Sequence, residues 1–142
     1  MNNELQQRIT RIQEICGAWG LYEPGNSSAI KQALKATSEI GELADAVLKN
    51  DIDEIKDAIG DIFVCWVNYA NLDGENGFCD NRFGWPADEI VLELKGEIPN
   101  IGLLDGIAQD YDLTLLECID AAIEAISKRK GVIKNGAFVK DE

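Results

Sequence analysis

The sequence predicts an all-α fold: an antiparallel helical bundle with a long aromatic loop and a small C-terminal β-hairpin. Apolar residues recur at the spacing of an α-helix in several long segments. Glycine and proline gather between those segments, where they interrupt the pattern. The length of 142 residues suits one domain, which we expect to span residues 1–142.

A first helix is predicted from residue 4 to about residue 19. Its apolar positions follow helical spacing: Leu5, Ile9, Ile12, Ile15 and Cys16. Gly20 and the segment 22–26, which contains a Pro-Gly pair, then interrupt the pattern. The helix is therefore expected to end before them.

Two longer helices follow, over about 28–49 and 52–72. Ser27 or Ser28 can cap the first of these helices, and Asp51 is a candidate cap for the second. The link between them is so short that the two helices must lie antiparallel. This helical pair is the part of the architecture that the sequence supports best.

The segment after the helical pair mixes glycine and proline with aromatic residues. Residues 73–88 include Phe78, Phe83 and Trp85, and a loop of this length in a small domain is usually functional or mobile. Shorter helices are expected beyond it, over 88–95 and 101–109.

A last long helix is predicted from residue 113 or 114 to about Lys130, with Gly131 ending it. The tail that follows has Asn135-Gly136 between pairs of apolar residues. Asn-Gly is a strong signal for a tight turn, so residues 132–139 are expected to form the hairpin.

Composition excludes several classes of function. The net charge is −13, whereas a general nucleic-acid binder needs a basic surface. Histidine is absent, which excludes catalytic triads and zinc sites that use it. No apolar run reaches the roughly 20 residues of a membrane span.

The cysteines are widely scattered, and none forms a Cys-x-x-Cys pair: Cys16, Cys65, Cys79 and Cys118. A zinc site is therefore not expected. The sequence opens with a polar helical pattern rather than a signal peptide. We interpret the cysteines as buried, reduced thiols of a cytoplasmic protein.

Acidic residues border the apolar stripes of the two long helices. Glu39 and Glu42 are three residues apart and share a face, one turn after Lys35. A polar stripe follows the apolar face of the next helix: Glu54, Asp57, Asp61 and Asn68. Because the helices are antiparallel, we expect the two acidic stripes to meet.

Charge determines what can lie between such carboxylates. Two like charges about 4 Å apart repel by about 4 kcal/mol at an effective dielectric of about 20. That is a large part of the roughly 5–15 kcal/mol that stabilises a domain, so protons or cations must neutralise the group. With oxygen ligands only, a hard cation such as Mg²⁺ or Mn²⁺ fits best.

Other interpretations stay open on the spacing alone. Acids three residues apart also occur on ordinary solvated helix faces. A strongly acidic helical protein can be a non-catalytic interaction protein or a DNA mimic that binds a basic partner. This alternative predicts acids spread over the exterior and no stabilisation by Mg²⁺.

Two segments resemble the acidic motifs of the MazG-like family of all-α nucleoside triphosphate pyrophosphohydrolases. The family has Glu-x-x-Glu on one helix and Glu-x-x-Asp on the next; residues 38–45 contain Glu39 and Glu42, and residues 57–62 contain Asp61. Three further segments resemble the small, phage-type members: residues 112–118, 128–131 and 135–140.

One position departs from the family pattern. Glu-x-x-Asp would place a glutamate at position 58, where this sequence has Ala58. Asp57 lies four residues before Asp61 and faces the same side, so we expect it to substitute as a ligand. Glu54 is a second candidate.

The resemblance implies magnesium-dependent hydrolysis of a (deoxy)nucleoside triphosphate to the monophosphate and pyrophosphate. It assigns the metal to four carboxylates: Glu39, Glu42, Asp57 and Asp61. Of these, Glu39, Glu42 and Asp61 are the expected catalytic residues, with one glutamate acting as base toward water. Mn²⁺ is a possible replacement for Mg²⁺.

Local positive charge should help to hold the triphosphate. Arg129 and Lys130 match the family's C-terminal run, and Lys35 precedes Glu39 by one turn, so all three are expected to bind substrate phosphates. The alternatives are that Lys35 only pairs with Glu39 and that the other two only stabilise a helix C-terminus. Trp19, Phe83 and Trp85 are candidates for stacking on the base, although such residues are more often in the core.

By analogy with the family, we expect a homodimer or homotetramer. The negative net charge and the lack of a long apolar run predict that it binds neither nucleic acid nor membrane. A protein with this fold that binds nucleotides without cleaving them is the remaining alternative, because Ala58 could report lost catalysis.

Overall fold

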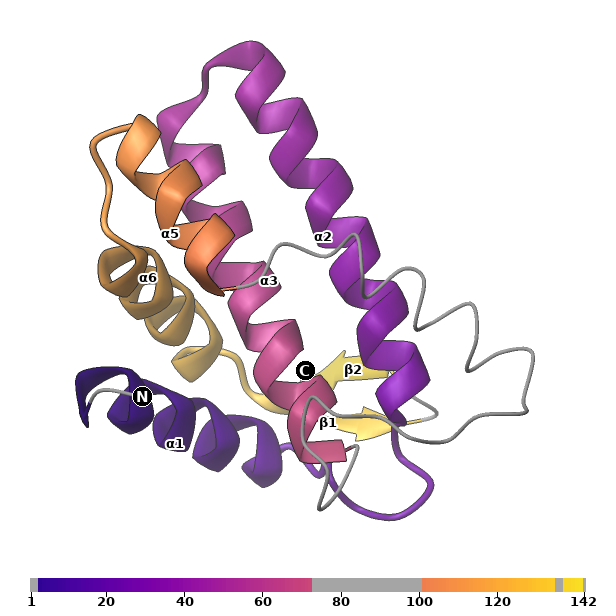
Figure 1. The fold of residues 1–142 in the computed structure, drawn as a ribbon. Helices are drawn as coiled ribbons and strands as arrows, with labels where there is room; N and C mark the ends of the chain where they lie inside the picture. The colour runs from indigo at the N-terminus through magenta and orange to yellow at the C-terminus, as the bar shows by residue number, and fades with distance from the viewer. Residues whose placement is uncertain (1–2, 73–100, 135–136, 142) are drawn as a thin grey trace, which may run out of the picture.

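A computed structural model describes residues 3–72, 101–134 and 137–141. Its helices are α1 (Asn3–Ala18), α2 (Ala29–Lys49), α3 (Ile52–Leu72), α5 (Ile101–Asp110) and α6 (Leu115–Ser127). Its strands are β1 (Gly131–Lys134) and β2 (Ala137–Lys140). The all-α prediction with a small hairpin is confirmed (Figure 1). The predicted aromatic loop over 73–88 and the helix over 88–95 lie outside the described residues.

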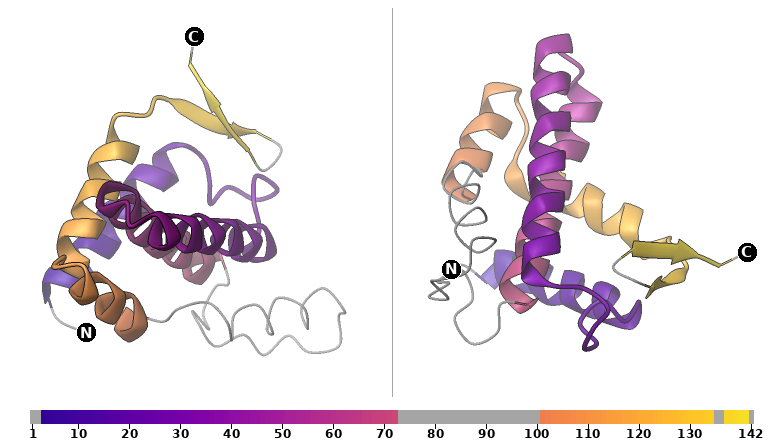
Figure 2. Two further views of the ribbon diagram at one scale, coloured as in Figure 1. Left: turned by 90° about the horizontal axis from the view of Figure 1, so that it is seen from above. Right: turned by 90° about the vertical axis from the view of Figure 1, so that its right-hand side faces the viewer.

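Helix α3 is the central element of the described structure. It packs most extensively against α2, which runs antiparallel beside it, and then against α6, α1 and α5 (Figures 1 and 2). The largest fully buried side chains come from four of these helices: Ile12, Ile55, Ile59, Ile62, Phe63, Leu104 and Ile119. Leu43 and Ala46 of α2 join the same core, and this packing of α2 on α3 determines where their acidic residues lie.

The starts of α2 and α3 are capped as predicted, and the link between the two helices is short. Ser28 caps α2, and its hydroxyl oxygen accepts a hydrogen bond from the Lys31 N–H at 3.2 Å. Asn50 ends α2 with φ 54° in the left-handed region. Asp51 then accepts from the Glu54 N–H at 3.1 Å and so caps α3 as expected.

The prediction that α6 continues to Lys130 is wrong. The helix begins after its cap, Thr114, and ends at Ser127. The Lys130 carbonyl instead accepts a hydrogen bond from the Asp141 N–H at 2.8 Å, which extends the pairing of the hairpin. Gly131 therefore belongs to β1 and does not cap the helix.

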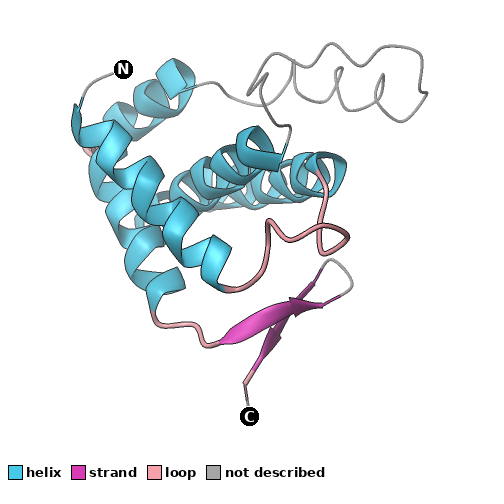
Figure 3. Ribbon diagram, turned by 90° about the horizontal axis from the view of Figure 1, so that it is seen from below, coloured by secondary structure: helices cyan, strands magenta, loops and turns pink. Residues whose placement is uncertain are grey.

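The hairpin pairs β1 with β2 in antiparallel register, with Ile133 opposite Phe138. It lies at one edge of the helical body (Figure 3). The Ile133 N–H donates to the Trp19 carbonyl at 2.8 Å, which attaches the hairpin to the end of α1. A Cβ at Gly131 would overlap the Val139 carbonyl and the Phe138 ring, so only glycine permits this close pairing.

Gly60 sets the distance between α3 and α6. A Cβ there would overlap the Cys118 carbonyl oxygen and lie 2.8 Å from the Ala122 Cβ. We expect Gly60→Ala to lower the free energy of unfolding by about 1–3 kcal/mol, because a packed core resists added volume. Gly106→Ala is the matched control: nothing lies within 4 Å of its added Cβ. It should stabilise the helix by up to about 1 kcal/mol. Urea denaturation measures both, and equal effects would contradict this packing.

Candidate functional site

Three carboxylates converge between α2 and α3. Glu39 and Glu42 come from one face of α2, and Asp61 comes from the facing side of α3. One oxygen of each lies within 4.8 Å of the others, close enough for all three to hold one metal ion. The antiparallel link and the three-residue spacing on α2 produce this arrangement, as the sequence predicted.

Glu39 is the most enclosed member of the group. Glu39 is only 8% exposed. Its Oε1 lies 3.6 Å from Lys35 Nζ, but Oε2 is buried and has no hydrogen-bond partner among the described residues. A buried carboxylate oxygen without a partner is costly. A cation bound between the three carboxylates would remove that cost.

The electrostatics of the group agree with its geometry. Burial, the adjoining Glu42 carboxyl and the charge of Asp61 together raise the pKa of Glu39 to about 7. Burial also raises the pKa of Asp61, although Arg129 opposes the shift. Burial is the largest cause of both shifts, and neighbouring carboxylates add to it. The only ion pair that the described residues form with the three carboxylates comes from Lys35. The oxygen-only donor set suits a hard divalent cation.

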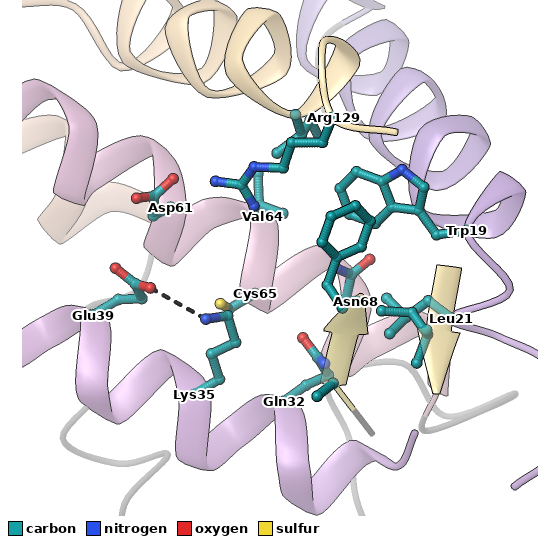
Figure 4. A pocket seen from close by; sticks show the side chains of 14 residues that line it. Trp19, Leu21, Gln32, Lys35, Glu39, Asp61, Val64, Cys65, Asn68 and Arg129 are labelled. Atoms are coloured by element: carbon teal, nitrogen blue, oxygen red, sulfur yellow. Dashed lines mark ion pairs between the residues drawn. The ribbon is translucent and has the colours of Figure 1, made fainter. Parts of the chain in front are cut away.

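A cavity of about 430 Å³ adjoins this group, within the size range of small-molecule sites. Glu39 and Asp61 lie at one end of it, with Lys35 and Arg129 beside them (Figure 4). Lys35 and Arg129 thus occupy positions from which they can contact phosphates. Lys130 is exposed and lines neither this cavity nor the one described next.

A second cavity of about 380 Å³ is lined by Glu42 and Asp61. Asp57 and Glu54 line it, together with Ala58. Asp57 is not one of the three carboxylates that approach within 4.8 Å. Both candidates for the substitute ligand thus remain near Asp61, and the choice between them stays a prediction.

Sequence reasoning did not assign some residues of the first cavity to a site. Gln32, Asn68 and Phe138 all line it. Asn68 gave the clearest signal, because it belongs to the same predicted polar stripe as Asp57 and Asp61. The stacking candidate Trp19 lines the cavity too, whereas Phe83 and Trp85 lie outside the described residues.

Two further predictions concern the cysteines and membrane-spanning segments. Cys16, Cys65 and Cys118 are free and buried, and Cys79 falls in the undescribed segment. None of the helices in the described ranges is both long and apolar enough to cross a membrane.

The raised pKa of Glu39 makes the stability of the metal-free protein depend on pH. Folding raises this pKa from 4.5 to about 7, so protonation of Glu39 favours the folded state. The stability that Glu39 contributes is therefore complete below about pH 4.5 and is lost as the pH rises through 7. In EDTA, we expect the melting temperature to fall between about pH 5 and pH 8. Glu39→Gln should lose most of this dependence. Circular dichroism melts measure it, and an unchanged slope in the variant would contradict the assignment.

The comparisons with known proteins agree with this geometry. A sequence model of the MazG nucleotide pyrophosphohydrolase domain matches residues 28–80, which include all of α2 and α3. An "uncharacterized 18.2 kDa protein in rep-hol intergenic region" of Haemophilus phage HP1 is 44% identical, over 84% of this chain and 98% of the relative. No solved structure gives a significant match. The chain belongs to the MazG-like family of nucleotide pyrophosphohydrolases.

Proposed function

We propose that this protein hydrolyses a (deoxy)nucleoside triphosphate to the monophosphate and pyrophosphate, with Mg²⁺ as its cofactor. The observation that carries the proposal is the convergence of Glu39, Glu42 and Asp61 around a buried carboxylate oxygen without a partner. The adjoining cavity supports it, because the cations Lys35 and Arg129 line its wall.

The metal would be held by Glu39, Glu42 and Asp61, with Asp57 as a further ligand from the second cavity. When bound, such an ion supplies positive charge to phosphate oxygens and lowers the pKa of a bound water. Mn²⁺ has similar ligand preferences and should substitute.

The chain's own residues orient the substrate and move the proton. Lys35 and Arg129 can bind the phosphates from the cavity wall, which brings a polyanion into a protein of net charge −13. Glu39 lines this cavity and Glu42 does not, which favours Glu39 over Glu42 as the acceptor of the water proton. The α–β phosphoanhydride bond breaks. The hydroxyl of the water forms a new bond to one of the two phosphorus atoms, and its proton is released to the other product.

We also propose a homodimer or homotetramer. Leu34 and Leu48 are 49% and 81% exposed, and Gly41 lies between them on α2 with nothing near its Cβ position. These residues recur at seven-residue spacing, so they share one face of the helix. Such a face can pack against a second copy of the chain.

A substrate panel tests the proposed activity. Purified protein with Mg²⁺ should release pyrophosphate from at least one canonical or modified (deoxy)nucleoside triphosphate. Absence of pyrophosphate across the panel, with Mn²⁺ also tried, would contradict the proposal. Tight nucleotide binding without turnover would favour the non-catalytic nucleotide binder, and neither binding nor turnover would favour the acidic interaction protein.

A further inference from the structure

The cavity beside the carboxylates has two chemically different ends. Glu39, Asp61, Lys35 and Arg129 make one end charged. The walls farther along are uncharged, combining apolar and aromatic groups with two carboxamides: Trp19, Leu21, Gln32, Asn68 and Phe138. Figure 4 shows Trp19 and Leu21 on the side away from Glu39 and Asp61. A nucleotide has the same asymmetry, because its charged phosphates lead to an uncharged, planar base.

Two aromatic rings from distant parts of the chain meet at the uncharged end. The centroids of Trp19 and Phe138 are 4.7 Å apart, with 54° between the ring planes. The hydrogen bond from Ile133 to the Trp19 carbonyl and the burial of Ile133 hold the hairpin in this position. The hairpin therefore supplies a wall of the cavity. Aromatic side chains are the usual platform on which bases stack.

Asn68 presents a carboxamide of fixed orientation in the same wall. The residue is only 4% exposed. Its Oδ1 accepts a hydrogen bond from the Tyr22 hydroxyl at 2.6 Å, and its Nδ2 donates to Cys16 Sγ at 3.5 Å. A carboxamide carries two N–H donors and two oxygen lone pairs, so one donor and one acceptor of Asn68 are left unused by the described residues and can serve a ligand.

Gln32 repeats this arrangement from α2. It is 6% exposed, and its Nε2 donates to Ser27 Oγ at 3.4 Å. The Oε1 atom of Gln32 has no hydrogen bond to the described residues, although it can accept one. Both carboxamides therefore have hydrogen-bonding capacity that the described residues do not use.

We infer that the hairpin end of this cavity binds the nucleobase, with the Trp19–Phe138 pair against one of its faces and Asn68, positioned by Tyr22, hydrogen-bonded to its edge. This inference rests on the proposed function and deepens it, because it names the residues that select the base. Sites that hydrogen-bond a ligand reject analogues that lack the matching group much more strongly than apolar pockets do. Asn68 is accordingly the residue whose change should alter base preference.

Binding of products tests the inference without requiring hydrolysis. Isothermal titration calorimetry in EDTA would compare the four deoxynucleoside 5′-monophosphates with 2-deoxyribose 5-phosphate, which has no base. We expect at least one monophosphate to bind about tenfold or more tightly than the base-free probe, in line with stacking of about 1–3 kcal/mol per base. Equal binding of the base-free probe and all four monophosphates would overturn the inference.

Substitutions distinguish the residues that stack on the base from the residue that selects among bases. Trp19→Ala and Phe138→Ala should weaken binding of every monophosphate by about tenfold. Val139→Ala is the control for hairpin disturbance, because Val139 is exposed on the same strand and lines neither cavity; it should leave binding unchanged. Equal losses in Phe138→Ala and Val139→Ala would overturn the stacking role.

Asn68→Asp should reorder the preference among the four bases, because it replaces an N–H donor by an acceptor of almost the same shape. In turnover, the change should appear as base-dependent KM with a smaller effect on kcat. Should Asn68→Asp fail to fold, Tyr22→Phe is the second variant. It keeps the ring but removes the hydroxyl that holds the Asn68 carboxamide, so the four monophosphates should bind with more similar affinities. An unchanged ranking in the folded variants would overturn the inference. Ranked monophosphate binding without any turnover would instead contradict only the proposed hydrolysis.

Discussion

Glu42→Gln should lower pyrophosphate release by about 100- to 1,000-fold. The substitution keeps the shape of the side chain but removes one of the three charges that converge between α2 and α3. Charge stabilisation by a catalytic metal contributes several kcal/mol to the transition state, and each 1.36 kcal/mol corresponds to about tenfold in rate. Steady-state rates at saturating Mg²⁺ would measure the loss.

The fold should survive this change, because Glu42 is exposed and lies outside the core. The far-ultraviolet circular dichroism spectrum should therefore match that of the wild type. Glu14→Gln, which removes the same charge from an exposed position on α1, is the matched control and should keep full activity. A Glu42→Gln enzyme as active as this control would show that Glu42 is not part of the catalytic site.

Mg²⁺ should stabilise the wild-type protein against heat by roughly 5–10 °C at a concentration about 100 times its Kd. Binding at that concentration adds about 2.7 kcal/mol to the free energy of unfolding, and 1 kcal/mol shifts the melting temperature of a domain of this size by about 2–4 °C. Glu39→Gln should abolish most of the increase. Differential scanning calorimetry at constant ionic strength measures both.

The metal-free variant gives an independent check. At pH 8, Glu39→Gln without metal should melt at least as high as the metal-free wild type, because the buried charge and its repulsion from Asp61 are gone. Glu124→Gln, exposed on α6, should retain the full response to Mg²⁺. If Glu39→Gln kept the wild-type increase, the ion would bind elsewhere.

Local patterns were enough to predict the part of the fold that positions the acids. Helical spacing, the Ser28 cap and the short link through Asp51 depend on residues close in sequence. They predict two antiparallel helices and bring Glu39 toward Asp61. The choice between Asp57 and Glu54 is different, because both lie along one side of α3 and only the coordination of an ion distinguishes them.

Tertiary pairing explains what the sequence could not predict. The early end of α6 follows from the pairing of Lys130 with Asp141, and the role of Gly131 follows from its contact with β2. Tyr22 and Asn68 are 46 residues apart in sequence, so no local pattern connects them. The same is true of Trp19 and Phe138, which meet only because the hairpin is attached to the end of α1.

Anomalous diffraction from crystals grown with Mn²⁺ tests most directly whether the three carboxylates hold a divalent ion. The anomalous difference map should show a peak between Glu39, Glu42 and Asp61, with at least one oxygen of each within about 2.0–2.3 Å, the range of carboxylate bonds to such ions. A protein that turns over nucleotide while its Mn²⁺ peak lies away from these three side chains would contradict this site.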